Sequence, residues 1–95
     1  MKLDRSRAYA PPDFSTDFGK AGVFALQAMA NGEANEGQQK IALNYLIHEI
    51  CRTYDLSFRP DDRGGERETA FAEGRRYVGI LIERVLKNSF EVLTS

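Results

Sequence analysis

The side chains best suited to metal or nucleophilic chemistry are the only histidine, His48, and the only cysteine, Cys51. They are three residues apart, so a helix would place them side by side on its surface. A structural zinc site needs four ligands, and a nucleophilic cysteine needs a base and a group that orients it. These two residues supply neither set. We therefore predict no metal site, no cofactor and no catalytic residue, with Cys51 as a small buried side chain and His48 on the surface.

Carboxylates gather in a predicted loop at residues 55–65 and in the start of the helix that follows it. Paired carboxylates can transfer protons or hold magnesium. Arginines alternate with them in the order Arg59, Asp61, Asp62, Arg63, Glu66, Arg67 and Glu68. This alternation favours a solvated loop with local ion pairs over an acid–base site. The pair Gly64-Gly65 lacks the Lys-Ser/Thr and the preceding strand of a phosphate-binding loop.

Basic residues could contact phosphate or a protein partner. Arg75 and Arg76 are adjacent on a long predicted helix, and residues 2–7 hold a local basic excess with a net charge of +2. From residue 55 to residue 95, seven basic and eight acidic residues nearly cancel. Such a balance is typical of an ion-paired surface rather than of a DNA-binding face.

Several apolar side chains near the C-terminus exceed what one helix face can bury in a small domain, which favours an interaction protein over an enzyme. Together with the basic residues, they define eight candidate contacts with a partner. These candidates are Arg5, Arg7, Tyr9, Arg75, Arg76, Tyr77, Ile80 and Phe90.

The composition limits the class of protein. The chain has 95 residues, a net charge of −1 and 42% apolar residues, which suits one small domain with a modest core. One cysteine cannot form an internal disulfide framework. No apolar run is long enough to span a bilayer, and the first residues lack the apolar core of a signal peptide. We expect a soluble domain that is made in the cytoplasm.

The pattern predicts an all-α fold, a small bundle of about three helices with an extended N-terminal arm. Apolar spacing and cap residues place the helices at about 15–31, 35–54 and 66–88, with a frayed end of the last helix reaching to residue 93. The arm covers residues 1–13, outside the core, because it contains a Pro-Pro pair. Residues 14–95 form the single helical domain.

The long predicted helix has one apolar face, which we expect to pack internally. Its members are Phe71, Val78, Leu81, Ile82 and Val85. Gly74 lies on the same face, where the missing side chain would let another backbone come close.

A short motif resembles a known family. The segment Leu56-Ser57-Phe58-Arg59-Pro60, followed by Thr69-Ala70-Phe71-Ala72-Glu73-Gly74-Arg75-Arg76, is similar to the signature of small proteins encoded by tailed phages. These are chiefly podoviruses and related prophages, and the founding member comes from a Bordetella phage. The similarity covers about residues 41–86, whereas the first forty residues carry little of it.

The resemblance implies a function without catalytic residues. Genes of this family generally lie among packaging and head genes, near those of the terminase and the portal. It therefore implies a non-enzymatic virion component, made in the host cytoplasm. We place it at the portal vertex, the head–tail region or the tail interior, with a role in DNA retention or ejection. Its partners would be portal or tail proteins in a symmetric multi-copy assembly, with DNA as a secondary partner.

Two alternatives remain. One is a DNA-packaging factor that resembles a small terminase subunit and binds DNA through the arm and Arg75 and Arg76. The other is a weakly oligomeric regulatory protein that acts on the host.

Overall fold

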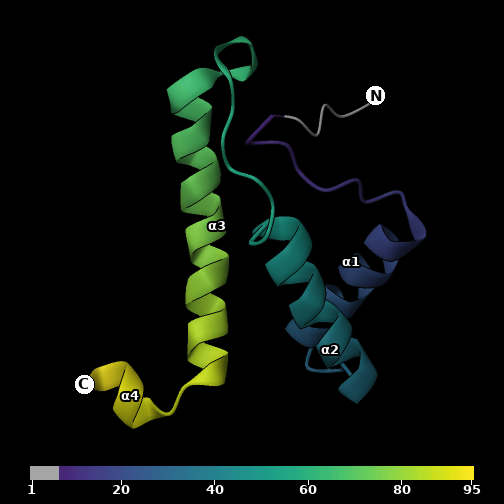
Figure 1. Ribbon diagram of the computed structural model, residues 1–95. Helices are drawn as coiled ribbons and strands as arrows, with labels where there is room; N and C mark the ends of the chain where they lie inside the picture. The colour runs from purple at the N-terminus through teal and green to yellow at the C-terminus, as the bar shows by residue number, and fades with distance from the viewer. Residues whose placement is uncertain (1–6) are drawn as a thin grey trace.

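The computed structural model describes residues 7–95, and every regular element in this range is helical. The order is α1 (Asp17–Ala30), α2 (Glu36–Tyr45), the π-helical turn η1 (Leu46–Ile50), the 3-10 turn η2 (Asp61–Arg63), α3 (Gly65–Lys87) and α4 (Phe90–Thr94). Helices α1 and α2 form a hairpin, and α3 stands beside them (Figure 1). The predicted all-α class with three main helices is confirmed.

Local capping sets the ends of the hairpin. The Thr16 hydroxyl accepts the Gly19 N–H at 2.9 Å and starts α1, and Gly32 ends its turn with a φ of 72°. The side chain of Asn35 accepts the backbone N–H of Gln38, whose own side chain accepts the Asn35 N–H in return. This capping box fixes the start of α2.

The second helix ends earlier than predicted. Its regular α-helical part stops at Tyr45 and continues only as the π turn to Ile50. The Thr53 hydroxyl then donates to the carbonyl of Ile47 at 2.6 Å, and Arg52 adopts a left-handed φ of 48°. This side-chain hydrogen bond competes with helix continuation, so the chain turns toward α3 instead of extending the helix to residue 54.

The third helix runs nearly as predicted, but it does not fray to residue 93. The Asn88 backbone is extended, and its side-chain amide donates to the carbonyl of Arg84 at 2.8 Å. The Ser89 side chain then accepts the Val92 N–H and caps a separate short helix, α4. The chain therefore ends in an elbow whose helix lies away from α1 and α2 (Figure 1).

The core is built mainly from small residues. Of the eight buried apolar residues in the described range 7–95, five are alanines, namely Ala8, Ala10, Ala25, Ala42 and Ala72. The largest buried side chain is Tyr45, whose ring lies 5.7 Å from that of Phe18 and directly over Gly22 of α1. Small residues let the backbones approach closely, so the hairpin closes around one tyrosine ring.

A glycine also lets α3 approach the segment of Cys51 and Thr53 closely, but this glycine is Gly79 and not the predicted Gly74. A Cβ at Gly79 would overlap the Thr53 hydroxyl, whereas a Cβ at Gly74 would meet nothing within 4 Å. The prediction that the Gly74 face packs internally is therefore wrong within the described chain. Phe71, Val78 and Val85 on that face are 52%, 50% and 62% exposed.

The predicted arm is partly core. Ala8 and Ala10 are 1% and 5% exposed, and Pro12 is buried. The placement of residues 1–13 outside the core is thus wrong for Ala8, Ala10 and Pro12, whereas Tyr9 and Pro11 are exposed. The first six residues of the predicted arm lie outside the described residues.

The molecule is flat and open. Its extents are 43 × 42 × 17 Å and its radius of gyration is 15.3 Å, whereas a compact domain of this length has about 12 Å. The C-terminal half of α3 stands clear of the hairpin (Figure 1). Within residues 7–95, none of the helices has the length and apolar character needed to cross a membrane.

The close approach at Gly22 makes a testable prediction. Gly22→Ala should lower the free energy of unfolding by about 1–3 kcal/mol, because its methyl group collides with the buried Tyr45 ring. Gly37→Ala in α2 is the matched control, since a Cβ there meets only the Asn35 side chain at an ordinary 3.5 Å. It should leave stability unchanged or raise it by up to about 1 kcal/mol. Urea unfolding followed by circular dichroism measures both, and equal effects would contradict the packing described.

Candidate protein-binding surface

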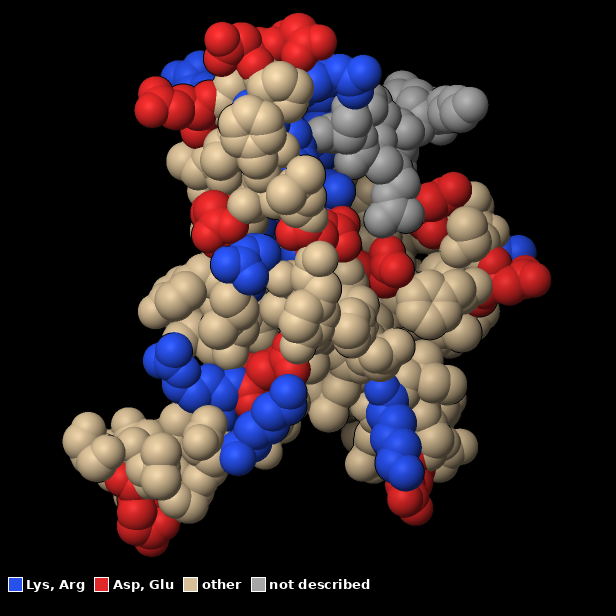
Figure 2. Space-filling view, viewed as in Figure 1, with Lys and Arg blue, Asp and Glu red and all other residues tan. Residues whose placement is uncertain are grey.

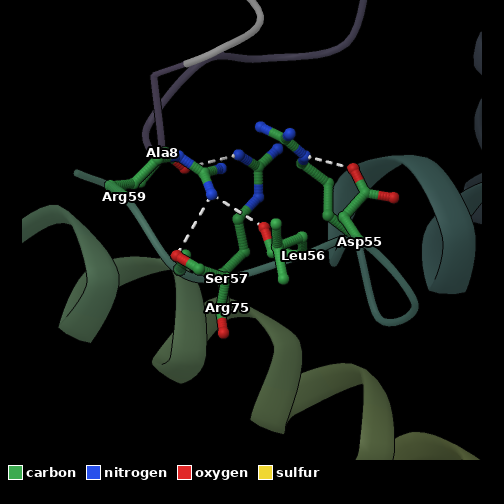
Figure 3. Close-up of a pocket in the computed structure, with 8 residues that line it drawn as sticks. Ala8, Asp55, Leu56, Ser57, Arg59 and Arg75 are labelled. Atoms are coloured by element: carbon green, nitrogen blue, oxygen red, sulfur yellow. Dashed lines mark hydrogen bonds and ion pairs between the residues drawn. The ribbon is translucent and has the colours of Figure 1, made fainter. Parts of the chain in front are cut away.

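Three arginines from different segments converge beside the N-terminal segment. Arg52 follows η1, Arg59 lies in the loop before η2, and Arg75 lies in the middle of α3. Figure 3 shows the Arg59 and Arg75 side chains directed toward Ala8 and toward the loop that contains Leu56 and Ser57. We call Arg52, Arg59 and Arg75 the arginine cluster.

Arg75 holds three parts of the chain together. Its Nε donates to the carbonyl of Ile50 at 2.6 Å, and its Nη1 donates to the carbonyls of Ala8 and Ala10 at 2.9 and 2.7 Å. These carbonyls belong to the end of η1 and to the N-terminal segment. Arg75 was predicted to contact a partner, but in the structure its guanidinium donates hydrogen bonds to backbone carbonyls of its own chain.

The other two members of the cluster order the loop. Arg59 is only 8% exposed, and its Nη1 donates to the carbonyls of Leu56 and Ser57 at 2.7 and 3.1 Å. Arg52 donates through Nε to Asp55 at 2.7 Å and through Nη1 to the carbonyl of Arg7 at 3.3 Å. The prediction of a solvated loop is therefore wrong at Arg59, because the loop backbone needs these donors.

Glu68 is the acidic counterpart of the cluster. It is 6% exposed and accepts Arg7 Nε and the backbone N–H of Ala8, both at 2.8 Å. The hydrogen bonds from Arg7 and then from Ala8 hold the pKa of this carboxyl below its ordinary value. Glu68 was also predicted to be solvated, and instead it fixes the start of the N-terminal segment on α3.

Once the segment is fixed, an apolar groove remains between it and α3. The groove has a volume of about 720 Å³. Phe71, Gly74 and Val78 of α3 form one side, while Tyr9 and Phe14 lie on the other. An open apolar groove with few polar groups is typical of a surface that receives another apolar element.

The groove continues into an exposed stripe along α3. Below the groove, Leu81 and Val85 follow on the same helix face, and they are 37% and 62% exposed. We call the set Phe71, Gly74, Val78, Leu81 and Val85 the α3 stripe. Sequence periodicity correctly placed these residues on one face, but the face is turned away from the core.

The remaining predicted contact residues do not form one site. Tyr9, Tyr77 and Phe90 are exposed at 58%, 53% and 75%, but they lie respectively in the groove, beside the α3 stripe and on α4. Contact of these side chains with a partner stays a prediction.

Four other candidates have different surroundings. Arg76 is paired with Glu73 at 3.0 Å, and Ile80 is half-buried. Arg7 is bound to Glu68, and its guanidinium lies 5.1 Å from the centre of the Tyr9 ring. Arg5 lies outside the described residues.

Sequence reasoning missed the arginine cluster, although one signal pointed to it. Ala72 and Gly79 lie three residues before and four residues after Arg75, so all three share one helix face. Two small residues on a face indicate close backbone contact, which would have placed Arg75 on the inner side. Nothing comparable in the sequence marks Arg59 or Glu68 as buried.

Other chemistry is sparse in this part of the chain. Cys51 is buried as predicted, and burial raises the pKa of its thiol. His48 is exposed as predicted, and its ring lies 5.2 Å from that of Tyr54. Residues 7–95 hold no group of three His, Cys, Asp or Glu side chains arranged to bind a metal ion.

Known proteins offer no match. Comparison with protein-family models gave none, and comparisons with curated proteins and with solved structures gave no significant match. The site is therefore interpreted from its own geometry and from the motif resemblance.

The adjacent arginines of α3 give a matched test of the cluster. Arg75→Ala should lower the free energy of unfolding by about 3 kcal/mol or more, because three carbonyls lose a charged donor. Arg76→Ala should cost less than about 1 kcal/mol, since it removes one exposed pair with Glu73. Urea unfolding measures both values. Equal losses would contradict the internal role of Arg75.

The lowered pKa of Glu68 predicts a pH dependence. A carboxyl with a lowered folded-state pKa stabilises the fold above its ordinary pKa of about 4.3, and this contribution is lost as the pH falls through the folded-state value. Glu68→Gln should therefore lower the melting temperature most at pH 7, and the difference from wild type should shrink on acidification to pH 3. Glu36→Gln, in an exposed pair with Lys40, is the control and should show little effect at any pH. A difference for Glu68→Gln that does not change with pH would refute the ionic role.

Proposed function

We propose that the protein is a non-enzymatic structural component of a bacteriophage virion, made in the host cytoplasm and assembled at the portal vertex, head–tail region or tail interior. There it acts in retention or ejection of the DNA. It works as one copy among several in an assembly with portal or tail proteins.

The proposal rests mainly on where the apolar residues lie: small ones are buried and large ones are exposed. The core is mostly alanine, while Phe24, Phe58 and Phe90 are 63%, 62% and 75% exposed. Large apolar side chains left outside a small core favour a subunit whose surface is completed by other proteins.

The choice of a phage assembly rests on the resemblance of the motif. Its residues perform connected structural tasks here. The Thr69 hydroxyl accepts the Arg59 N–H at 2.8 Å, the Ser57 hydroxyl donates to Glu73, and Arg75 binds the N-terminal segment. The motif therefore builds the loop and the groove, which agrees with a signature that carries no catalytic residue.

The DNA-packaging alternative has less support. It relied on the arm and on Arg75 and Arg76. The two arginines are bound to internal carbonyls and to Glu73 respectively, while residues 1–6 of the arm lie outside the described residues. On the face shown in Figure 2, basic and acidic side chains are interspersed. Proteins that bind DNA mainly through phosphates need a continuous basic surface.

Mass spectrometry of purified particles tests the proposal. Particles of the encoding phage or induced prophage should contain this chain in a constant ratio to the portal protein through successive gradients. A host ribosomal protein is the control for trapped contaminants and should decline with each gradient. If the chain is abundant in the lysate but missing from the particles, the virion role is wrong.

A DNA titration distinguishes the proposed virion component from the DNA-packaging factor. With the purified chain we expect no useful affinity for duplex DNA at physiological salt. Tight binding that weakens steeply with salt would favour the packaging factor instead.

A further inference from the structure

The α3 stripe repeats with the period of paired helices. Phe71, Val78 and Val85 are each seven residues apart, and Gly74 and Leu81 occupy the intermediate positions. These are the a and d positions of a heptad, the pattern that packs one helix along another. No charged residue lies on the stripe, and its side chains are exposed within the described chain.

We infer that the α3 stripe pairs with the same stripe of a second copy of this chain, with the two α3 helices antiparallel across a two-fold axis. Each copy would then place the C-terminal half of its α3 in the apolar groove of the other. The inference deepens the proposed function by naming one partner, and it rests on that proposal in treating the exposed apolar surface as an interface.

The two halves of α3 complement each other. The N-terminal half forms one side of the open groove, opposite Tyr9 and Phe14. The C-terminal half stands clear of the hairpin, with Leu81 and Val85 exposed (Figure 1). Only an antiparallel arrangement brings the C-terminal half of each copy into the groove of the other, and a two-fold axis satisfies both contacts at once.

Side-chain size suggests the register. A Cβ at Gly74 would meet nothing within 4 Å, so this position offers space for a large side chain from outside. Aligning Val78 with Leu81 of the second copy places Gly74 opposite Val85. This alignment pairs the smallest residue of the stripe with its most exposed one.

Light scattering coupled to size exclusion tests the pairing with the full chain. Wild type should elute with about twice the monomer mass of 10.7 kDa. Val78→Glu should weaken the dimer at least about 100-fold, since it places two carboxylates in one apolar seam. Phe24→Glu is the matched control, because Phe24 is a similarly exposed apolar residue on α1, and it should remain dimeric. Circular dichroism checks that each variant is folded.

Cysteine crosslinking tests the direction and the register. In a Cys51→Ala background, Gly74→Cys and Val85→Cys proteins are prepared separately, mixed and oxidised. Antiparallel pairing predicts a disulfide between the two different variants and little crosslinking of either variant alone. Crosslinking of each variant only with itself would show parallel pairing and overturn the inference.

A wild-type chain that stays monomeric at 100 µM, or a Val78→Glu variant that stays dimeric, would also overturn it. Neither result would decide the virion role, which the particle measurement tests separately.

Discussion

The rest of the structure depends on one constraint: backbone carbonyls outside the regular helices must find hydrogen-bond donors. Residues 7–10 and 51–60 lie outside the regular helices, and Ala8, Ala10 and Arg59 within them are buried. Buried carbonyls without a donor cost free energy, and the chain satisfies them with arginine side chains. A guanidinium stays charged and carries five N–H donors in one plane, so Arg75 can reach Ile50, Ala8 and Ala10 together. Lysine has no such fork.

The arginine cluster accounts for the small buried residues beside it, Ala8, Ala10 and Ala72. Because polar links hold the N-terminal segment, the loop and α3 together, few large apolar side chains are needed between them. Ala8, Ala72 and Gly79 allow the close approach that these hydrogen bonds require. The large apolar side chains are then left for the outside, in the groove, along the α3 stripe and on α4. The arginine cluster and the exposed apolar surface therefore follow from the same way of packing α3.

The sequence predicted the elements well and their orientation less well. Caps such as Asn35 and the stop at Asn31-Gly32 act locally, so the helix ends they define could be found. Periodicity grouped Phe71, Val78 and Val85 on one face, but a helix does not reveal whether its apolar face meets its own chain or another copy. The polar residues were harder still, because the burial of Arg59 and Glu68 depends on partners up to sixty-one residues away.

The same arrangement ties folding to assembly. A core of alanines around a single tyrosine ring gives a chain of this length little reserve of stability. A partner that covers the α3 stripe binds the folded form alone, so it adds its binding free energy to the stability of the fold. The stripe and the arginine cluster share α3, and hence a contact that holds the helix also holds Arg75 against the N-terminal segment. In the proposed assembly, partner binding would therefore strengthen the hydrogen bonds of the arginine cluster and make this small protein more rigid at the contact.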